Sequence, residues 1–422
     1  MATTGDGPAL FRWRSWCVTR RAGICNNGRI VLRPASRLLG WCCLTLALAG
    51  CDAFDFGRVL GAPSPSTKAA AAPSGSAGPA PKARASRFVV IAGGDVALGG
   101  NVASFLHADK DYDPLSGLRP ILEGTNLRVA SLVSPLSDRA APAAKGAAPT
   151  GRAHAADALA RAGVDALSVA NPELWSYGEE PFADTLSSLA HAKIAALGGW
   201  AARTDPGKEL SPAELSVDGW SIALFAVATW PEKGPSQEGR AHVGLADPEK
   251  LAKAIREARP HHDLVLVSHH AGRALSDSPG ADQLAVARAA IEAGADAVFD
   301  QGAHVPAGVA WISGRPAFYG LGNLVADEDP KNPWTGRSYL ARIAFGAAGS
   351  EREVDACPYM IVDGEPKLLA GVGRPVQEAV FHRAIAGLSE PFGGTRLGEP
   401  DLHSCMRLRP TSEPVTDSSA PP

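Results

Sequence analysis

Short apolar runs recur along the chain from Phe88 onward and predict buried strands. The first run, FVVIAG at 88–93, is rich in β-branched residues and ends at glycine, and comparable runs cover 127–133, 164–170, 221–228, 263–268 and 295–299. Helical patterns lie between several of them, at 155–163, 181–193, 248–258 and 281–294. Strands that alternate with helices predict an α/β domain with a largely parallel sheet. Segments 316–327 and 338–345 have the pattern of a late hairpin-like addition, and the signal weakens from about residue 347.

The apolar run near the amino terminus is of a different kind. Residues 38–50 read LLGWCCLTLALAG, an uncharged stretch of 13 residues that follows Arg33 and Arg37. It is too short to span a hydrocarbon core of roughly 30 Å as a helix, but it has the length of a signal-peptide apolar region. It ends in the sequence Leu-Ala-Gly-Cys at 48–51, which resembles the lipobox of bacterial lipoproteins. That resemblance implies cleavage before Cys51 and a lipid on its thiol; in the alternative, an ordinary secretory signal, Cys51 is incidental.

A linker follows the signal. Of the 26 residues at 61–86, 22 are Ala, Pro, Ser or Gly, which leaves too little apolar bulk for a core. The chain is therefore predicted to comprise a lipoprotein signal peptide (1–50), a lipid-anchor cysteine with a linker (51–87), a folded domain (88–346), and a carboxy-terminal extension with a disordered tail (347–422). Such a protein would be tethered to a membrane in the bacterial cell envelope, outside the cytoplasm.

Composition and charge narrow the class of protein. The 422 residues are 45% hydrophobic and 20% charged, as in ordinary soluble globular proteins. Residues 1–50 hold seven arginines and one acidic residue, so 34 basic and 43 acidic residues lie beyond position 50. The acidic balance of the body argues against a general nucleic-acid-binding function.

Cysteine usage agrees with export. Four of the seven cysteines lie in the leader and Cys51 would carry lipid, which leaves Cys357 and Cys405 in the folded part. A single pair in an oxidising compartment predicts a disulfide between them. The alternative is two unrelated buried thiols.

Several predicted strands end in residues that carry useful chemistry. Asp95 follows the first strand, and Asn171-Pro172-Glu173 follows the strand at 164–170. His270 lies just after the strand at 263–268, and the strand at 295–299 runs into a loop that contains His304. Side chains at such strand ends converge on a crevice, and a set of Asp, Glu and two His is typical of metal-assisted hydrolases. Any one histidine at a strand end is nevertheless more often a structural residue.

Taken in order, six segments resemble the CapA family of poly-γ-glutamate capsule synthesis proteins, which belongs with the calcineurin-like metallophosphatases. FVVIAGGDVALGG is similar to the family's opening strand with Gly-Asp-Val, SLVSPLS stands in place of Asn-Leu-Glu-x-Pro-Leu-Thr, and VSHHAG is similar to Val-Ser-x-His-Trp-Gly. The other three are VDALSVANPELWSYG, AGADAVFDQGAHV and FYGLGNLV. The resemblance implies an α/β calcineurin-like metallophosphatase sandwich, with mixed β-sheets flanked by helices.

Residue by residue, the resemblance carries over only in part. Asp95, His270 and His304 coincide with metal-site positions of the family, and Asn171 and Asn323 stand in segments that the resemblance assigns to substrate binding. The family's remaining ligands and acid are replaced, at Val133, Pro172, Glu173 and either Gln301 or Gly302. A two-metal centre needs bridging and terminal ligands for both ions, so a full binuclear phosphatase is not expected.

Two interpretations of the crevice remain open. Two histidines and one carboxylate suffice for a single divalent ion such as Zn, Mn or Fe, with His270 and Glu173 as the catalytic groups. Alternatively, the crevice is a vestige that binds no metal and holds a polymer or partner without catalysis, which is the interpretation we favour. The resemblance implies a role in making, exporting or anchoring an anionic surface polymer such as poly-γ-glutamate, alongside envelope biosynthesis proteins.

Other residues near the crevice have simpler explanations. The glycines at 93–100 match neither the P-loop nor the GxGxxG motif for phosphate binding, so they are predicted to allow close packing. Trp175 and Tyr177 would either stack on a ligand or pack beneath a loop.

Overall fold

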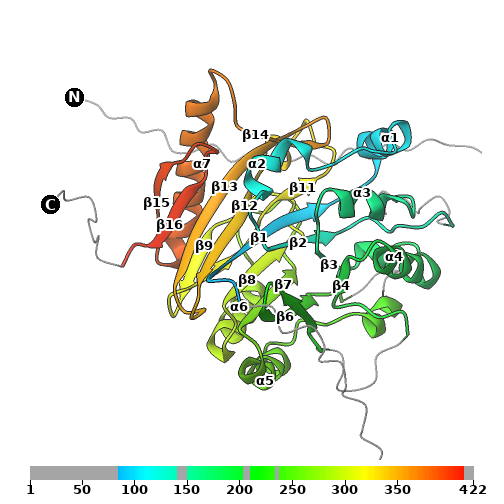
Figure 1. Cartoon of the computed structure of the whole chain (residues 1–422), viewed down its shortest axis with the longest axis horizontal. Coiled ribbons are helices and arrows are strands. Elements are labelled where there is room, and N and C mark those ends of the chain that lie inside the picture. Colours follow the sequence, from blue (N-terminus) through cyan, green and yellow to red (C-terminus); the bar gives the residue numbers. More distant parts are fainter. Residues whose placement is uncertain (1–83, 140–149, 203–209, 233–236, 413–422) are drawn as a thin grey trace, which may run out of the picture. The chain divides into compact units, whose positions relative to one another are not determined.

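The described residues form two β-sheets packed against each other, with helices around them (Figure 1). The computed structural model describes residues 84–139, 150–202, 210–232 and 237–412. The predicted signal peptide, Cys51 and nearly all of the linker lie outside the described residues. No helix within the described ranges is long and apolar enough to cross a membrane.

The first sheet has ten strands, and its two halves differ in strand direction. Strands β1 to β4 and the short β11 run parallel, whereas β12 to β16 pair antiparallel with one another and with β1. The order is β15-β16-β13-β12-β1-β2-β3-β4, with β11 beside β1 and β14 beside β13. The bounds are β1 Arg87–Val96, β2 Leu127–Leu132, β3 Ala166–Ser168, β4 Ala195–Leu197, β11 Asn323–Val325, β12 Arg337–Gly346, β13 Arg352–Val362, β14 Glu365–Leu368, β15 Thr395–Pro400 and β16 Met406–Pro410.

The second sheet has six strands in the order β5-β6-β7-β8-β10-β9. Its four central strands are parallel, and each edge strand is antiparallel to its neighbour. The bounds are β5 Ala213–Val217, β6 Trp220–Ala228, β7 Leu264–His270, β8 Ala297–Gln301, β9 Val309–Ile312 and β10 Arg315–Phe318.

The helices follow the amphipathic patterns of the sequence. The predicted helices at 155–163, 181–193, 248–258 and 281–294 are confirmed as α3 to α6, and the structure adds α1, α2 and α7. The bounds are α1 Gly100–Ala108, α2 Arg119–Leu122, α3 Ala155–Arg161, α4 Glu179–His191, α5 Pro248–Ala258, α6 Ala281–Ala293 and α7 Arg374–Ser389. Short 3₁₀ turns are η1 Ser116–Leu118, η2 Glu173–Trp175, η3 Gln237–His242, η4 Arg259–His261, η5 Pro333–Gly336 and η6 Glu390–Phe392.

Alternation along the strands of the second sheet creates two separate cores. In β6, Ile222 and Leu224 pack in the main core together with residues of the first sheet, while Phe225 and Val227 pack in a second core with α5 and α6. Successive side chains of a strand point to opposite faces, so a run that is apolar at every position is buried on both sides. Burial on both faces therefore explains the continuous apolar runs from which buried strands were predicted.

The expected α/β sandwich with mixed sheets is confirmed, but two details of the strand prediction were wrong. The segments at 316–327 and 338–345 do not form a hairpin: β10 lies in the second sheet, and β12 lies in the first sheet between β1 and β13. β10 forms a hairpin with β9, through a tight turn at Ser313 and Gly314, which both have positive φ, and it pairs with β8 on its other side. The first sheet is also not largely parallel, because its carboxy-terminal half is antiparallel.

The segment after residue 347 adds four strands and α7 to the domain. β13 is an interior strand of the first sheet, paired with β12, β14 and β16. A disulfide joins Cys357, in the middle of β13, to Cys405, just before β16. Both cysteines are buried, so the bridge ties the last strands to the main core.

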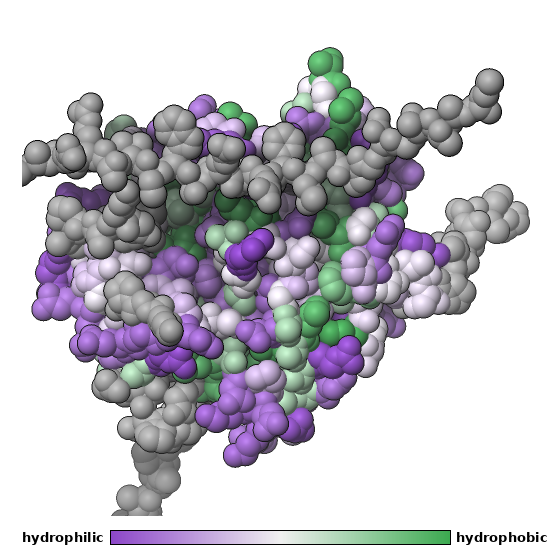
Figure 2. Space-filling model, turned by 180° about the vertical axis from the view of Figure 1, so that it is seen from behind, coloured by the Kyte–Doolittle hydropathy of each residue, from purple (hydrophilic) through white to green (hydrophobic). Residues whose placement is uncertain are grey.

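The surface is mixed in character, as is usual for folded proteins. The exposed large apolar side chains include Val372 and Val376 around the start of α7 and Leu402 in the turn before β16. Figure 2 shows hydrophobic side chains on a projection at the top of the face opposite to that of Figure 1, with hydrophilic side chains along the lower part.

Candidate functional site

A row of buried polar residues crosses the parallel half of the first sheet. Asp95 on β1 is in register with Asn323 on β11 and with Ser131 on β2, and Ser131 is in register with Ser168 on β3. Residues in register on neighbouring strands project from the same face of a sheet. All four are buried, so this face presents an unusual polar line to the second sheet.

Two glycines before Asp95 permit the approach that brings Asn323 beside it. The pairing of β1 with β2 is irregular between Ala92 and Asp95, and a Cβ on Gly94 would lie 1.8 Å from the carbonyl oxygen of Gly322. The amide of Asp95 donates to that same carbonyl over 3.1 Å. The prediction that these glycines serve close packing is therefore confirmed.

The second sheet supplies the histidines. His270 is the last residue of β7, and alternation places it on the face toward the first sheet, where Ser131 Oγ lies 3.4 Å from its Nδ1. His304 lies in the loop after β8 and has a φ of 61°, two residues beyond Gly302 with a φ of 105°. This sharp turn also aims the amide of Gly302 at Asp95, to which it donates over 3.0 Å.

Four of the predicted residues meet in one ion-paired cluster, formed by Asp95, Glu173, His270 and His304. The distance is 3.1 Å from His304 Nδ1 to Asp95 Oδ2 and 3.1 Å from His270 Nε2 to Glu173 Oε2. His270 Nδ1 lies 3.8 Å from Asp95 Oδ1, which links the two pairs. Each histidine therefore faces a carboxylate, and the four charges compensate one another.

The pairing shifts the protonation of its members. Burial alone would raise the pKa of Glu173, but the charge and hydrogen bond of His270 lower it to about 2. Burial alone would lower the pKa of His304, but its hydrogen bond to Asp95 and the charge of that carboxylate raise it to about 9. The pKa of His270 is likewise raised, against the effect of burial, by the charge of Glu173. These shifts favour the charged forms of Glu173, His270 and His304 over their neutral forms.

The two asparagines differ in their relation to this cluster. Asn323 Oδ1 lies 3.1 Å from His304 Nδ1, and its amide nitrogen donates to the carbonyl of Thr335. Asn171 is occupied by the backbone: its amide nitrogen donates to Leu132 O over 2.8 Å, and its oxygen accepts from Leu174 N over 3.0 Å. Asn171 thus fixes the turn η2 that carries Glu173.

Three of the positions at which the resemblance expects other residues are packed or hydrogen-bonded within the fold. Val133 is buried, and Pro172 precedes η2. Gln301 accepts a hydrogen bond from Ser268 Oγ over 2.9 Å and donates to Gly93 O over 3.4 Å. Trp175 is buried against Phe182, with 5.2 Å between the ring centroids, which favours the packing interpretation for that residue. Ser131 and the amide of Gly302 were missed as site groups, although both lie in the motif segments.

These residues do not fit a two-metal centre. Within the described ranges, no group of three or more His, Cys, Asp or Glu side chains is arranged to hold a metal ion. Each histidine has a ring nitrogen against a carboxylate, and a protonated imidazole would have to lose its proton before it could ligate a metal. One observation favours a single cation: Asp95 Oδ1 is buried and has no hydrogen-bond partner in the described part of the chain.

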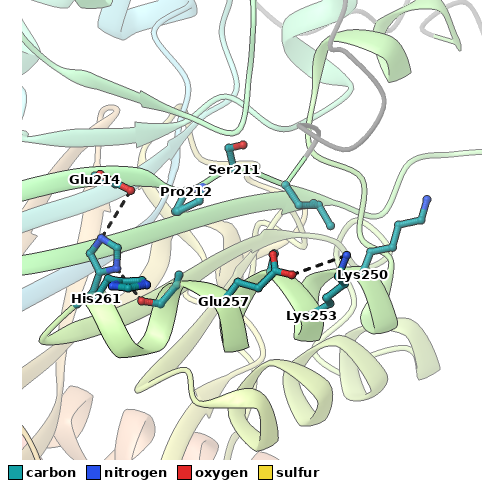
Figure 3. Close-up of a pocket in the computed structure, with 11 residues that line it drawn as sticks. Ser211, Pro212, Glu214, Lys250, Lys253, Glu257 and His261 are labelled. Carbon is teal, nitrogen blue, oxygen red and sulfur yellow. Dashed lines mark hydrogen bonds and ion pairs between the residues drawn. The ribbon is translucent and has the colours of Figure 1, made fainter.

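A separate hollow lies between β5, α5 and η4, away from this cluster (Figure 3). Its charged residues are largely compensated within the hollow: Lys253 Nζ lies 3.7 Å from Glu257, and His262 Nε2 lies 3.9 Å from Glu214. None of the residues predicted for the site lines it. The chemistry-bearing groups therefore lie in the ion-paired cluster and not in this hollow.

Comparisons with known proteins agree with the motifs. A family model described as "Bacterial capsule synthesis protein PGA_cap" matches residues 89–328. "PGA biosynthesis protein CapA" of Bacillus subtilis (strain 168) is 32% identical over 163 residues, which is 38% of this chain and 42% of the relative. "Capsule biosynthesis protein CapA" of Bacillus anthracis is 26% identical over 219 residues, 50% of this chain and 51% of the relative.

Among solved structures, a hypothetical protein from Thermus thermophilus matches with a TM-score of 0.42 and 18% identity, over 65% of this chain and 99% of that one. The chain spans about half the length of the curated relatives it matches.

Proposed function

The chain belongs to the family of bacterial capsule synthesis proteins described as PGA_cap, and from this membership we propose that it acts in the synthesis, export or anchoring of a capsular polymer. The names of its relatives refer to capsule and PGA biosynthesis, so an anionic polymer such as poly-γ-glutamate is the proposed cargo. The protein would work in the bacterial cell envelope, tethered by a lipid on Cys51 and the linker up to residue 87.

The observation that carries this proposal is the ion-paired cluster. In this cluster each histidine faces a carboxylate, His304 with Asp95 and His270 with Glu173. A site whose histidines are already paired favours hydrogen bonding to a ligand over metal-assisted hydrolysis. We therefore propose a degenerate metal site that contacts the polymer without cleaving it.

His304 is the member of the cluster that a polymer would reach. Its side chain is 30% exposed, whereas that of His270 is 6% exposed. The acidic balance of the body would repel a polyanion, so any attraction must be local. We propose that the imidazolium of His304, with Asn323 beside it, contacts polymer carboxylates, and that Asn171 positions Glu173.

The proposal is tested in the bacterium of origin by measuring polymer attached to cells and polymer released to the medium. Deletion of the gene should remove or displace the surface polymer, and His304→Ala should reproduce that loss at an unchanged protein level. His382→Ala is the matched control, because His382 lies on α7 and its ring contacts only the carbonyl of Leu397. An unchanged polymer after deletion would reject the proposed function.

A second function, hydrolysis at a single metal ion, is favoured by the unpartnered Oδ1 of Asp95. A divalent ion there would supply a Lewis acid for an envelope phosphoester or amide. Asp95, His270 and His304 would hold the ion, and Glu173, which lies against His270, would handle the proton. A purified chain without a bound ion would exclude this alternative, and one ion per chain together with hydrolysis of an envelope phosphoester or amide would support it over the first proposal.

A further inference from the structure

A hydrogen-bonded chain of hydroxyl, imidazole and carboxylate lies on the other face of the second sheet. Thr229 Oγ1 is 3.0 Å from His269 Nε2, and His269 Nδ1 is 3.1 Å from Asp300 Oδ1. His269 and Asp300 are fully buried, whereas Thr229 is half-buried. Neither the capsule family nor the ion-paired cluster accounts for these three residues.

The strand pattern explains why consecutive histidines serve different sites. His270 points toward the first sheet, so His269 points to the opposite face, which α5 and α6 cover. His269 on β7 is in register with Asp300 on β8. Thr229 follows β6, and its amide donates to the carbonyl of His270 over 3.0 Å. This backbone hydrogen bond holds Thr229 in place, so that its hydroxyl lies at the end of the chain of side-chain hydrogen bonds.

The hydrogen bonds also determine which atoms of these three side chains donate and which accept. Gln283 Nε2 donates to the second oxygen of Asp300 over 3.1 Å, while Gln283 Oε1 accepts from the amide of Gly280. Asp300 is thus fixed as an acceptor facing His269, so the ring proton lies on Nδ1. Nε2 is then an acceptor, and the hydroxyl of Thr229 must donate to it. The lone pairs of Thr229 Oγ1 are left for another molecule.

Thr229 lines a small pocket between the end of β6 and the first turns of α5 and α6. Pro248, Asp282 and Arg240 line the same pocket, as does Trp230. The indole of Trp230 is 7% exposed, and its N–H has no hydrogen-bond partner within the described residues. Since a buried donor without a partner is unfavourable, this N–H is suited to a ligand oxygen.

We propose that Thr229, His269 and Asp300 form a site for acyl transfer from a carboxylic ester or amide. Thr229 Oγ1 bonds to the carbonyl carbon while its proton moves to His269 Nε2; the bond to the leaving group then breaks, and that group takes the proton. Water cleaves the resulting ester on Thr229, giving one proton to His269, which returns it to Thr229. Trp230 and Arg240 line the same pocket, and Arg240 supplies a cation for an anionic substrate. This activity is independent of the function proposed for the ion-paired cluster.

The test is labelling of the full chain with a fluorophosphonate, which reacts with an activated hydroxyl and releases fluoride. We expect one phosphonyl group per chain on the peptide that contains Thr229, by intact-mass and peptide mass spectrometry. Thr229→Ser should keep the label, and Thr229→Val, which preserves the side-chain shape, should abolish it. Asp300→Asn should slow labelling by about 10⁴-fold, because it disturbs the ring tautomer.

Thr185→Val is the matched control. It also removes a buried threonine hydroxyl, but that hydroxyl contacts only the backbone of Leu136 and Pro181, so labelling should persist. Melting temperatures establish that each variant is folded. The proposal is overturned if the folded wild-type chain takes up no label, or if the label remains in Thr229→Val. No label together with a lowered melting temperature for Thr229→Val would assign the three residues a purely structural role.

Discussion

Asp95 is the residue on which the ion-paired cluster depends. One oxygen accepts the amide of Gly302 and faces His304, and the other lies toward His270 without a hydrogen bond. The carboxylate is fully buried, so its charge must be compensated within the protein. A metal ion or an imidazolium can provide that compensation, and two histidines already do. The metal content of the purified protein shows whether a metal ion also compensates the charge of Asp95.

We expect the purified protein to hold at most one tightly bound divalent ion, and to have negligible activity on generic phosphomonoesters. A second ion would lack ligands where Val133, Pro172 and Gln301 stand, and binding it without partners is unfavourable. Elemental analysis should return roughly one metal or fewer per chain. His304→Ala should abolish whatever is bound, and His382→Ala should not. Two ions per chain with turnover that depends on Asp95 and His270 would contradict the degenerate site.

Gly94 offers a test of the close approach that positions Asp95. A Cβ there would meet the carbonyl oxygen of Gly322 at 1.8 Å, and the nearest atoms all belong to the backbone of Leu321 and Gly322, which cannot rotate away as a side chain could. Gly94→Ala should lower the free energy of unfolding by about 3 kcal/mol or more in denaturant titrations. Gly387→Ala is the control, because nothing lies within 4 Å of its added Cβ on α7. That change should stabilise by about 0.5–1 kcal/mol, and equal effects of the two variants would refute the steric argument.

At the residue scale the sequence predicted that residues at the strand ends would converge, because strand-end residues and motif order are both visible in it. Asp95, Glu173, His270 and His304 meet as the crevice argument expected. The pairing within the cluster was not predictable, since it depends on the turn at Gly302 and on distances between two sheets. The His269–Asp300 contact was missed for the same reason: only strand register places those residues together.

At the scale of elements, hydrophobic periodicity located six of the parallel strands (β1, β2, β3, β6, β7 and β8) and four helices, but it missed the parallel strand β4. It also failed where pairing with other strands decides which sheet a strand joins: β10, β11 and β12 follow one another in the sequence, but β10 belongs to the second sheet and the other two to the first. It also failed beyond residue 347, where β13 has a run of inward residues that includes Asp355 and Cys357. Asp355 is buried because Arg342 and Arg407 from the neighbouring strands pair with it. Buried charged residues that pair with residues of neighbouring strands interrupt the apolar pattern of the sequence, but they do not destabilise the strand.

The disulfide should matter most to these carboxy-terminal elements. Cys357 and Cys405 are separated by 48 residues, and closing a loop of that length stabilises the folded state by about 4 kcal/mol in the chain-entropy model. Thiol counting of the mature protein under denaturing, non-reducing conditions should find no free thiol. The double variant Cys357→Ala/Cys405→Ala should unfold at a lower denaturant concentration than the wild type. Two free thiols in the mature wild-type protein would reject the bridge.

At the scale of the whole molecule, the sandwich explains how one chain can carry two sites. Strands β7 and β8 are buried on both faces, so adjacent residues at their ends serve opposite sides. The face toward the first sheet has the ion-paired cluster, and the face toward α5 and α6 has Thr229, His269 and Asp300. A change at one face can therefore be tested without removing side chains from the other.

At the same scale we predict attachment to a membrane through Cys51, which lies outside the described residues. Beyond position 50 the chain has 43 acidic and 34 basic residues, so attraction to an anionic lipid surface is not expected from its charge. The sequence Leu-Ala-Gly-Cys at 48–51 ends an apolar run and predicts a lipid on Cys51 instead. Cys51→Ser should move the protein from the membrane fraction to the soluble fraction or block its processing. Cys42→Ser, in the leader, should leave the wild-type distribution unchanged. A high-salt wash should not release the wild-type protein, because an acyl anchor is held by apolar burial. Mass spectrometry that finds an unmodified amino terminus at another residue would exclude the anchor.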